Sequence, residues 1–200
     1  MTEVYDRESQ LQNRLNTFIE QDFGLPRADY YDRLNLEGFL RMKSVLSDIN
    51  NIFTMKVTLA FSEWVSNHLA LNETAKQEII SQIVETKPNA NGYDIEVSGP
   101  IKIIAEVKCN VPVNGGKVYG SAQKDGIAKD INSLIHGKSK SSIDPTDYLK
   151  FMVFLDMPEI RDATGHFVKN MRDEKERISF LDSNSKAEDT SRVYVAYVGF

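Results

Sequence analysis

Apolar side chains recur at helical spacing through the first 87 residues of the chain. The repeat of apolar positions at i, i+3, i+4 and i+7 predicts amphipathic helices over residues 3–23, 36–49 and 52–71. A further helix is expected after Asn72, because asparagine is a favoured N-cap and isoleucines at helical spacing follow it. Residues 1–87 are therefore predicted to be mainly helical.

The pattern changes after Lys87, where apolar and polar residues begin to alternate. This alternation predicts a strand over residues 93–97, and an apolar run predicts a second strand over 101–109. Residues 98–100, Ser-Gly-Pro, lie between them and predict a tight turn, so the two strands should form a hairpin. The remaining predicted elements are a helix over 121–136, a strand over 149–157, a helix over 158–171 and a strand over 192–200.

This order of elements indicates an α/β fold. We expect a central mixed β-sheet of about four or five strands, flanked by helices and preceded by a helical N-terminal part. A chain of 200 residues with 41% hydrophobic residues can bury one core, whereas two domains would leave two small halves. Residues 1–200 are thus predicted to be a single domain, mainly helical over 1–87 and α/β over 88–200.

The composition also bears on the location of the protein. No apolar run approaches the roughly 20 residues needed to span a bilayer, so no contact with a membrane is expected. The first residues, MTEVYDRESQ, lack the basic and apolar regions of a secretory signal peptide. Cys109 is the only cysteine and cannot form an internal disulfide, which fits a reducing compartment. These features predict a cytoplasmic protein.

Charge is distributed unevenly along the chain. The net charge is −5, but residues 101–150 carry eight lysines against five acidic residues. A locally positive face can attract a phosphate backbone even when the whole protein is acidic. An ordinary solvated surface would give the same count, so the charge alone does not decide between the two.

Two charged residues interrupt the apolar strand predicted over 101–109. Strand side chains alternate, so Glu106 and Lys108 point to one face and Val107 to the other. The hairpin places Asp94 within a rung or two of Glu106. Carboxylate oxygens are the ligands that Mg²⁺ prefers, and a lysine close by can orient an attacking water. The alternative is a surface ion pair of Lys108 with Asp94 or Glu106 on an edge strand.

At these residues the chain resembles the PD-(D/E)XK nuclease superfamily, whose members have the restriction-endonuclease-like fold. Asp94 matches the first acidic residue of that motif, and Glu106-Val107-Lys108 matches the triplet. The chain departs from the motif at Tyr93, where the family often has proline. The resemblance covers about residues 63–155, and it implies that Asp94 and Glu106 bind metal while Lys108 positions the water.

The resemblance also implies accessory residues. Glu63 lies on the helix before the hairpin, where many members carry a further acidic metal ligand, and Glu96 is a rival ligand on the face of Asp94. Gln123 and Lys124 begin the helix after the triplet, where the family often has a polar residue facing the active site. Lys129 and Lys138 are candidate phosphate contacts.

The function implied is that of a metal-dependent endonuclease acting on double-stranded DNA, with Mg²⁺ as cofactor and Mn²⁺ as a substitute. The size of the chain favours a type II restriction endonuclease, and cutting both strands of a palindromic site favours a homodimer. Residues 1–100 are the candidate for dimer contacts. Two alternatives stay open: a repair or junction-resolving nuclease that reads DNA shape, and a DNA-binding module of the same fold without cleavage.

Overall fold

A computed structural model describes residues 6–85, 92–99, 101–113, 116–182 and 185–200. The chain divides into two compact units, Met1–Asn50 and Asn51–Phe200. The division at Asn50 was not predicted, because the helical spacing of apolar residues continues across it. Among the described residues, no helix has both the length and the apolar content needed to cross a membrane.

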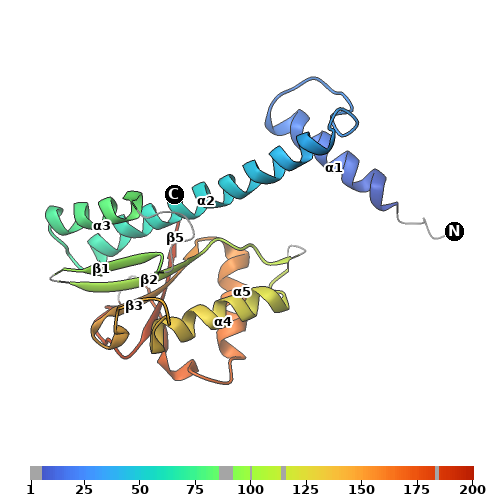
Figure 1. Ribbon diagram of the computed structural model, residues 1–200. Helices are drawn as coiled ribbons and strands as arrows, with labels where there is room; N and C mark the ends of the chain where they lie inside the picture. The colour runs from blue at the N-terminus through green and yellow to red at the C-terminus, as the bar shows by residue number, and fades with distance from the viewer. Residues whose placement is uncertain (1–5, 86–91, 100, 114–115, 183–184) are drawn as a thin grey trace. The chain divides into compact units, whose positions relative to one another are not determined.

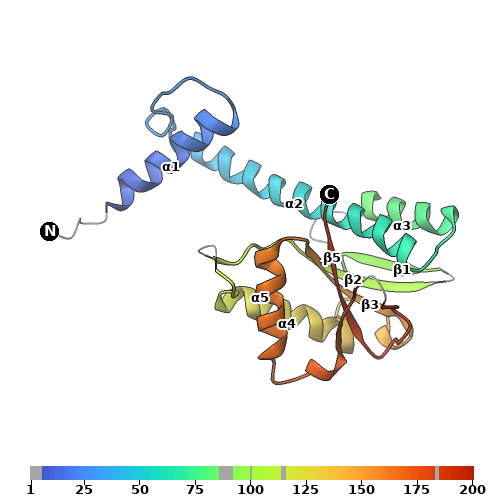
Figure 2. The same ribbon diagram turned by 180° about the vertical axis from the view of Figure 1, so that it is seen from behind.

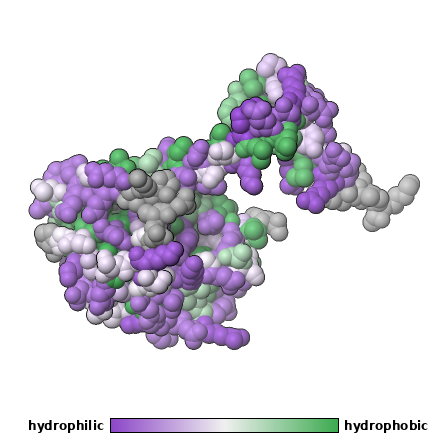
Figure 3. Space-filling view, in the orientation of Figure 1, coloured by the Kyte–Doolittle hydropathy of each residue, from purple (hydrophilic) through white to green (hydrophobic). Residues whose placement is uncertain are grey.

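The first unit contains α1 (Arg7–Asp22) and the beginning of α2 (Leu36–His68). Asp6 caps α1, since its Oδ1 accepts hydrogen bonds from two backbone N–H groups of the first turn. None of the apolar side chains described in this unit is buried, and part of its surface in Figure 3 is apolar. The exposed large apolar side chains here are Leu11, Phe18, Phe23, Leu25, Leu36, Phe39, Leu40, Val45, Leu46 and Ile49.

The separate helices predicted over 36–49 and 52–71 are wrong, because α2 is one continuous helix of 33 residues. Asn50 and Asn51 lie where the break was expected, and neither has the backbone restriction of proline or the flexibility of glycine. Asparagine therefore only weakens a helix at this point and does not end it. The predicted first helix begins at residue 3, and its residues 3–5 lie outside the described part of the chain.

The second unit is built round a five-stranded sheet with the strand order β1-β2-β3-β5-β4. β1 pairs antiparallel with β2, and the other neighbouring strands run parallel. The predicted α/β class and mixed sheet are therefore confirmed. The elements that follow α2 are α3 (Glu73–Glu85), β1 (Ile95–Ser98), β2 (Lys102–Lys108), α4 (Ser121–His136), β3 (Leu149–Leu155), α5 (Pro158–Lys169), β4 (Ile178–Phe180) and β5 (Val193–Val198).

Helices cover both faces of this sheet (Figures 1 and 2). On one face, α2 packs against β3, and the ring centroids of Phe61 and Phe151 lie 5.3 Å apart. On the other face, α4 buries Ile127, Ile131 and Leu134 beneath the sheet. The three layers bury apolar side chains on both sides of β2 and β3, which explains the nearly continuous apolar sequences of these parallel strands.

One strand of the sheet could not be predicted from the sequence pattern. β4 has only three residues, too few for alternation to be recognised. The turn between β1 and β2 agrees with the predicted hairpin at Ser98 and Gly99, while Pro100 lies outside the described residues.

The predicted N-cap Asn72 is confirmed, because its Oδ1 accepts a hydrogen bond of 2.9 Å from the N–H of Ala75 in the first turn of α3. Replacing Asn72 by alanine removes this acceptor and should lower the free energy of unfolding by about 1 kcal/mol. Urea denaturation followed by circular dichroism measures the change. Asn67→Ala, an exposed position near the end of α2, is the control and should change stability by less than about 0.5 kcal/mol.

Candidate active site

The β1–β2 hairpin brings two carboxylates together. Ile95 lies opposite Ala105 in the antiparallel register, so Asp94, directly before β1, continues the register opposite Glu106. A hydrogen bond of 2.7 Å from the N–H of Val107 to Asp94 Oδ2 fixes the Asp94 side chain against β2. The structure therefore brings the first two predicted site residues together.

Glu106 and Lys108 share the face of β2 that α4 covers, as the alternation of strand side chains requires. The Glu106 side chain is 5% exposed and forms an ion pair with Lys138, in the segment after α4. Lys108 forms an ion pair with Asp130 of α4. Among the ion pairs of the described residues, neither Asp94–Lys108 nor Glu106–Lys108 occurs; Glu106 and Lys108 each pair with another residue, so a structural network of ion pairs stays an alternative to a metal site.

The two carboxylates have raised pKa values. Burial is the main cause at Glu106, the charge of Asp94 adds to it, and the pKa reaches about 7 although Lys138 acts in the opposite direction. Burial is also the main cause of the raised pKa of Asp94. The hydrogen bond from the Val107 N–H and the charges of Lys108 and Lys138 act in the opposite direction and lower this pKa. Asp94 keeps an exposed side, whereas only 5% of the Glu106 side chain is exposed, so burial acts more strongly on Glu106.

This donor set fits a hard divalent cation. Mg²⁺ is commonly held by one or two carboxylates, with waters and substrate phosphates completing its six oxygen ligands. No group of three or more His, Cys, Asp or Glu side chains suited to a metal occurs within the described ranges. Within the described part of the chain, Asp94 and Glu106 are the two carboxylates that could hold such an ion, and water or phosphate oxygens would supply the remaining ligands.

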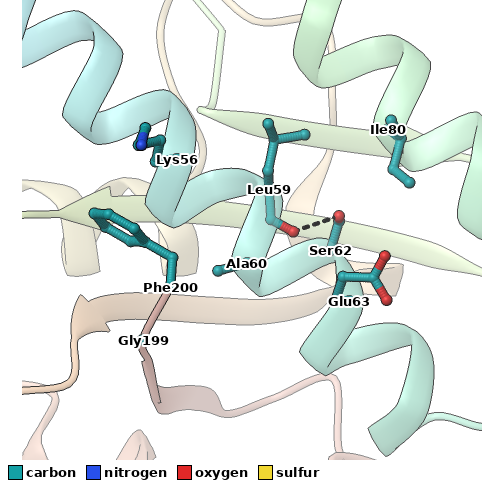
Figure 4. Close-up of a pocket in the computed structure, with 8 residues that line it drawn as sticks. All are labelled: Lys56, Leu59, Ala60, Ser62, Glu63, Ile80, Gly199 and Phe200. Atoms are coloured by element: carbon teal, nitrogen blue, oxygen red, sulfur yellow. Dashed lines mark hydrogen bonds between the residues drawn. The ribbon is translucent and has the colours of Figure 1, made fainter.

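Glu63 is not brought to this pair. It lies on α2, which packs on the opposite face of the sheet from Glu106, and its carboxylate forms an ion pair of 2.6 Å with Lys76 of α3. Figure 4 shows Glu63 at the edge of a pocket whose other lining residues include Lys56 and the C-terminal Phe200. In this structure the predicted metal ligand Glu63 thus has a cationic partner of its own.

The rival ligand Glu96 shares the face of Asp94 on β1 but is occupied in another way. Its Oε1 accepts a hydrogen bond of 2.8 Å from the N–H of Tyr93. The side chain thus folds back on the residues before β1, and the structure favours Asp94 over Glu96 as the partner of Glu106.

The residues predicted at the beginning of α4 have different surroundings. The Gln123 amide accepts a hydrogen bond of 3.0 Å from the Gly120 N–H and donates one of 2.9 Å to the Val111 carbonyl. Gln123 therefore joins α4 to the segment after β2, which is a structural role. Lys124 is half-buried and Lys129 is exposed, and within the described residues neither forms an ion pair.

Asp130 was not predicted as a site residue, and Lys138 was predicted only as a phosphate contact. A signal for Asp130 was present, because it lies three residues after Ile127 and four before Leu134, on the buried side of α4. A carboxylate on an apolar helix stripe indicates a buried partner in the same way as Glu106 does in an apolar strand. Lys138 offered no comparable signal.

A comparison of the chain with protein-family models, with curated proteins and with solved structures finds no match.

Proposed function

We propose that this protein is a Mg²⁺-dependent endodeoxyribonuclease that hydrolyses phosphodiester bonds in double-stranded DNA, and most specifically a type II restriction endonuclease. The observation that supports the proposal is the Asp94–Glu106 pair across the hairpin, with Lys108 two residues further along the same face of β2. The restriction-endonuclease-like arrangement of the sheet is part of this proposal.

Each residue has a role that its chemistry supports. Asp94 and Glu106 would hold Mg²⁺, with Mn²⁺ as a substitute, and the bound ion would neutralise the scissile phosphate and lower the pKa of a water molecule. The ammonium of Lys108 would orient that water and stabilise the negative charge that develops during attack. The ion pair with Asp130 limits the conformations of the Lys108 side chain, which is 24% exposed.

The choice of DNA as substrate rests on charge. The lysines of residues 101–150 include Lys124 and Lys129 on α4, and neither is committed to an ion pair with another described residue. Lysines that contact phosphates without reading bases would orient the duplex. The proposed homodimer would use α1 and the first turns of α2, whose exposed apolar side chains need a covering surface.

A second candidate is a DNA-binding module without cleavage. The ion pair of Glu106 with Lys138 favours it, because an internal ammonium already compensates part of the acidic charge. In such a module the carboxylates and lysines would form a structural network and would not bind metal.

Cleavage of supercoiled plasmid DNA tests the proposed activity. With Mg²⁺ or Mn²⁺ the protein should convert the plasmid to discrete linear fragments, while with Ca²⁺ or EDTA the plasmid should stay intact, because Ca²⁺ polarises water poorly. Glu106→Gln, prepared in the same way, is the control against contaminating nucleases. A smear in place of bands would favour a nuclease without sequence preference, and an intact plasmid under all conditions would favour the binding module.

A further inference from the structure

The ammonium of Lys138 lies in a place that is built to hold a cation. It forms an ion pair with Glu106 Oε1 and donates a hydrogen bond of 2.6 Å to the Gly92 carbonyl. It also lies 4.9 Å from the centroid of the Tyr93 ring, at a distance typical of a cation–π contact. Three different groups thus stabilise one positive charge beside the acidic pair.

The backbone and the aromatic ring fix this arrangement. Gly137, the residue before Lys138, has a φ of 93°, a conformation that side-chain-bearing residues rarely adopt, and it turns the chain away from α4. The Tyr93 hydroxyl donates a hydrogen bond of 2.9 Å to the Ser133 carbonyl of α4, which holds the ring in place. The end of α4 and the entry to β1 are joined at the point where Lys138 reaches Glu106.

The lysine that the motif resemblance assigns to catalysis does not compensate Glu106. Lys108 is paired with Asp130, so Lys138 is the only described residue that forms an ion pair with Glu106. Glu106 Oε1 accepts no hydrogen bond of regular geometry from the described residues beyond this ionic contact. Asp94 accepts its hydrogen bond from an uncharged backbone N–H. Lys138 is therefore the ammonium that Glu106 meets directly, while the charges of both Lys108 and Lys138 act on Asp94.

We propose that Lys138 is the resident counter-cation of Glu106 in the Asp94–Glu106 pair, and that a divalent cation must displace its ammonium in order to bind. This inference rests on the proposed function, since it concerns the metal affinity of the same site. A divalent cation bound between the carboxylates and an ammonium at Glu106 Oε1 would repel one another. Each therefore weakens the binding of the other. Lys138 thus lowers the metal affinity of the free protein.

Titration calorimetry with Mn²⁺ in the absence of DNA tests the inference. Lys138→Met removes the competing charge and keeps most of the side-chain volume, so its Mn²⁺ affinity should exceed that of the wild type by about tenfold or more. Lys138→Arg keeps the competing positive charge, so its Mn²⁺ affinity should stay below that of Lys138→Met. Lys140→Met, an exposed position two residues further on, should leave the affinity unchanged.

The outcomes separate the inference from the function on which it rests. If wild type and Lys138→Met bind Mn²⁺ equally, or the variant binds more weakly, Lys138 does not compete with the metal. This result refutes the inference but still supports the proposed metal site. If neither binds Mn²⁺, and Glu106→Gln behaves like both, the inference and the proposed metal site fail together.

A second measurement does not depend on the folding of a variant. Nitrogen-15 NMR of the lysine ammonium groups in the wild type should show a Lys138 signal that is protected from exchange in the metal-free protein. Saturation with Mg²⁺ should shift or broaden this signal and leave that of Lys140 in place. A Lys138 signal that stays unchanged at saturating Mg²⁺ would overturn the inference.

Discussion

Replacement of Lys108 by alanine is expected to reduce the rate of DNA cleavage by about a thousandfold, within the range found when a group that stabilises the developing charge is removed. The substitution keeps Asp94 and Glu106, so metal binding and affinity for DNA should change little. Single-turnover cleavage with Mg²⁺ measures the rate, and binding in Ca²⁺ measures the affinity. Cleavage at the wild-type rate would refute the role assigned to Lys108.

The structure calls for two controls in this experiment. Lys108→Ala leaves the half-buried Asp130 without its ion pair, which should cost about 1–3 kcal/mol of stability. The double variant Lys108→Ala with Asp130→Asn removes the uncompensated carboxylate, so its stability should recover while cleavage stays lost. Lys169→Ala, an exposed lysine on α5, removes the same charge at a distance and should cleave DNA at the wild-type rate.

The stability of the metal-free protein is expected to fall as the pH rises from about 4.5 to 7. Glu106 has a pKa of about 7 in the folded chain, above its ordinary value of 4.5, so its proton favours the folded state. The stabilisation is fully present below pH 4.5 and lost as the pH rises through 7. A shift of this size corresponds to an upper limit of roughly 3 kcal/mol for the group.

Melting curves in EDTA between pH 5 and 8 measure this loss. Glu106→Gln carries no titrating group at this position, so its stability should depend less on pH over the same range. Above pH 7, Mg²⁺ should restore the lost stability, because it binds the ionised carboxylates of the folded protein. The free energy of unfolding should rise by about 2.7 kcal/mol when the Mg²⁺ concentration is a hundred times the dissociation constant. If the wild type melts at the same temperature with EDTA, Mg²⁺ and Ca²⁺, with and without DNA, the metal site is refuted.

The sequence predicted those elements whose formation depends on neighbours in the chain. The helix over 121–136 was predicted with its observed bounds, because Gly137 follows a clear apolar stripe. The hairpin was predicted because its register follows from the alternation of side chains and a short turn. The proximity of Asp94 and Glu106 is a direct result of that register, so this half of the site could be derived without the structure.

The partners of the two lysines could not be predicted, because they depend on how α4 packs against the sheet. Lys108 was expected to act beside Glu106, yet α4 places Asp130 within its reach. A lysine side chain is long and flexible, so sequence distance says little about which carboxylate it meets. Glu63 shows the same limit, because its helix covers the opposite face of the sheet and Lys76 lies within reach there.

The parallel centre of the sheet has a consequence for the order in which the chain folds. Parallel neighbours need a crossover, so paired residues lie far apart in the chain: Ala105 and Phe151 are separated by 46 positions and Phe151 and Tyr194 by 43. The contacts that build the site span similar separations, 32 positions from Glu106 to Lys138 and 46 from Gly92 to Lys138. Non-local pairing of this kind is slow, so the site should form together with the parallel centre of the sheet and not ahead of it.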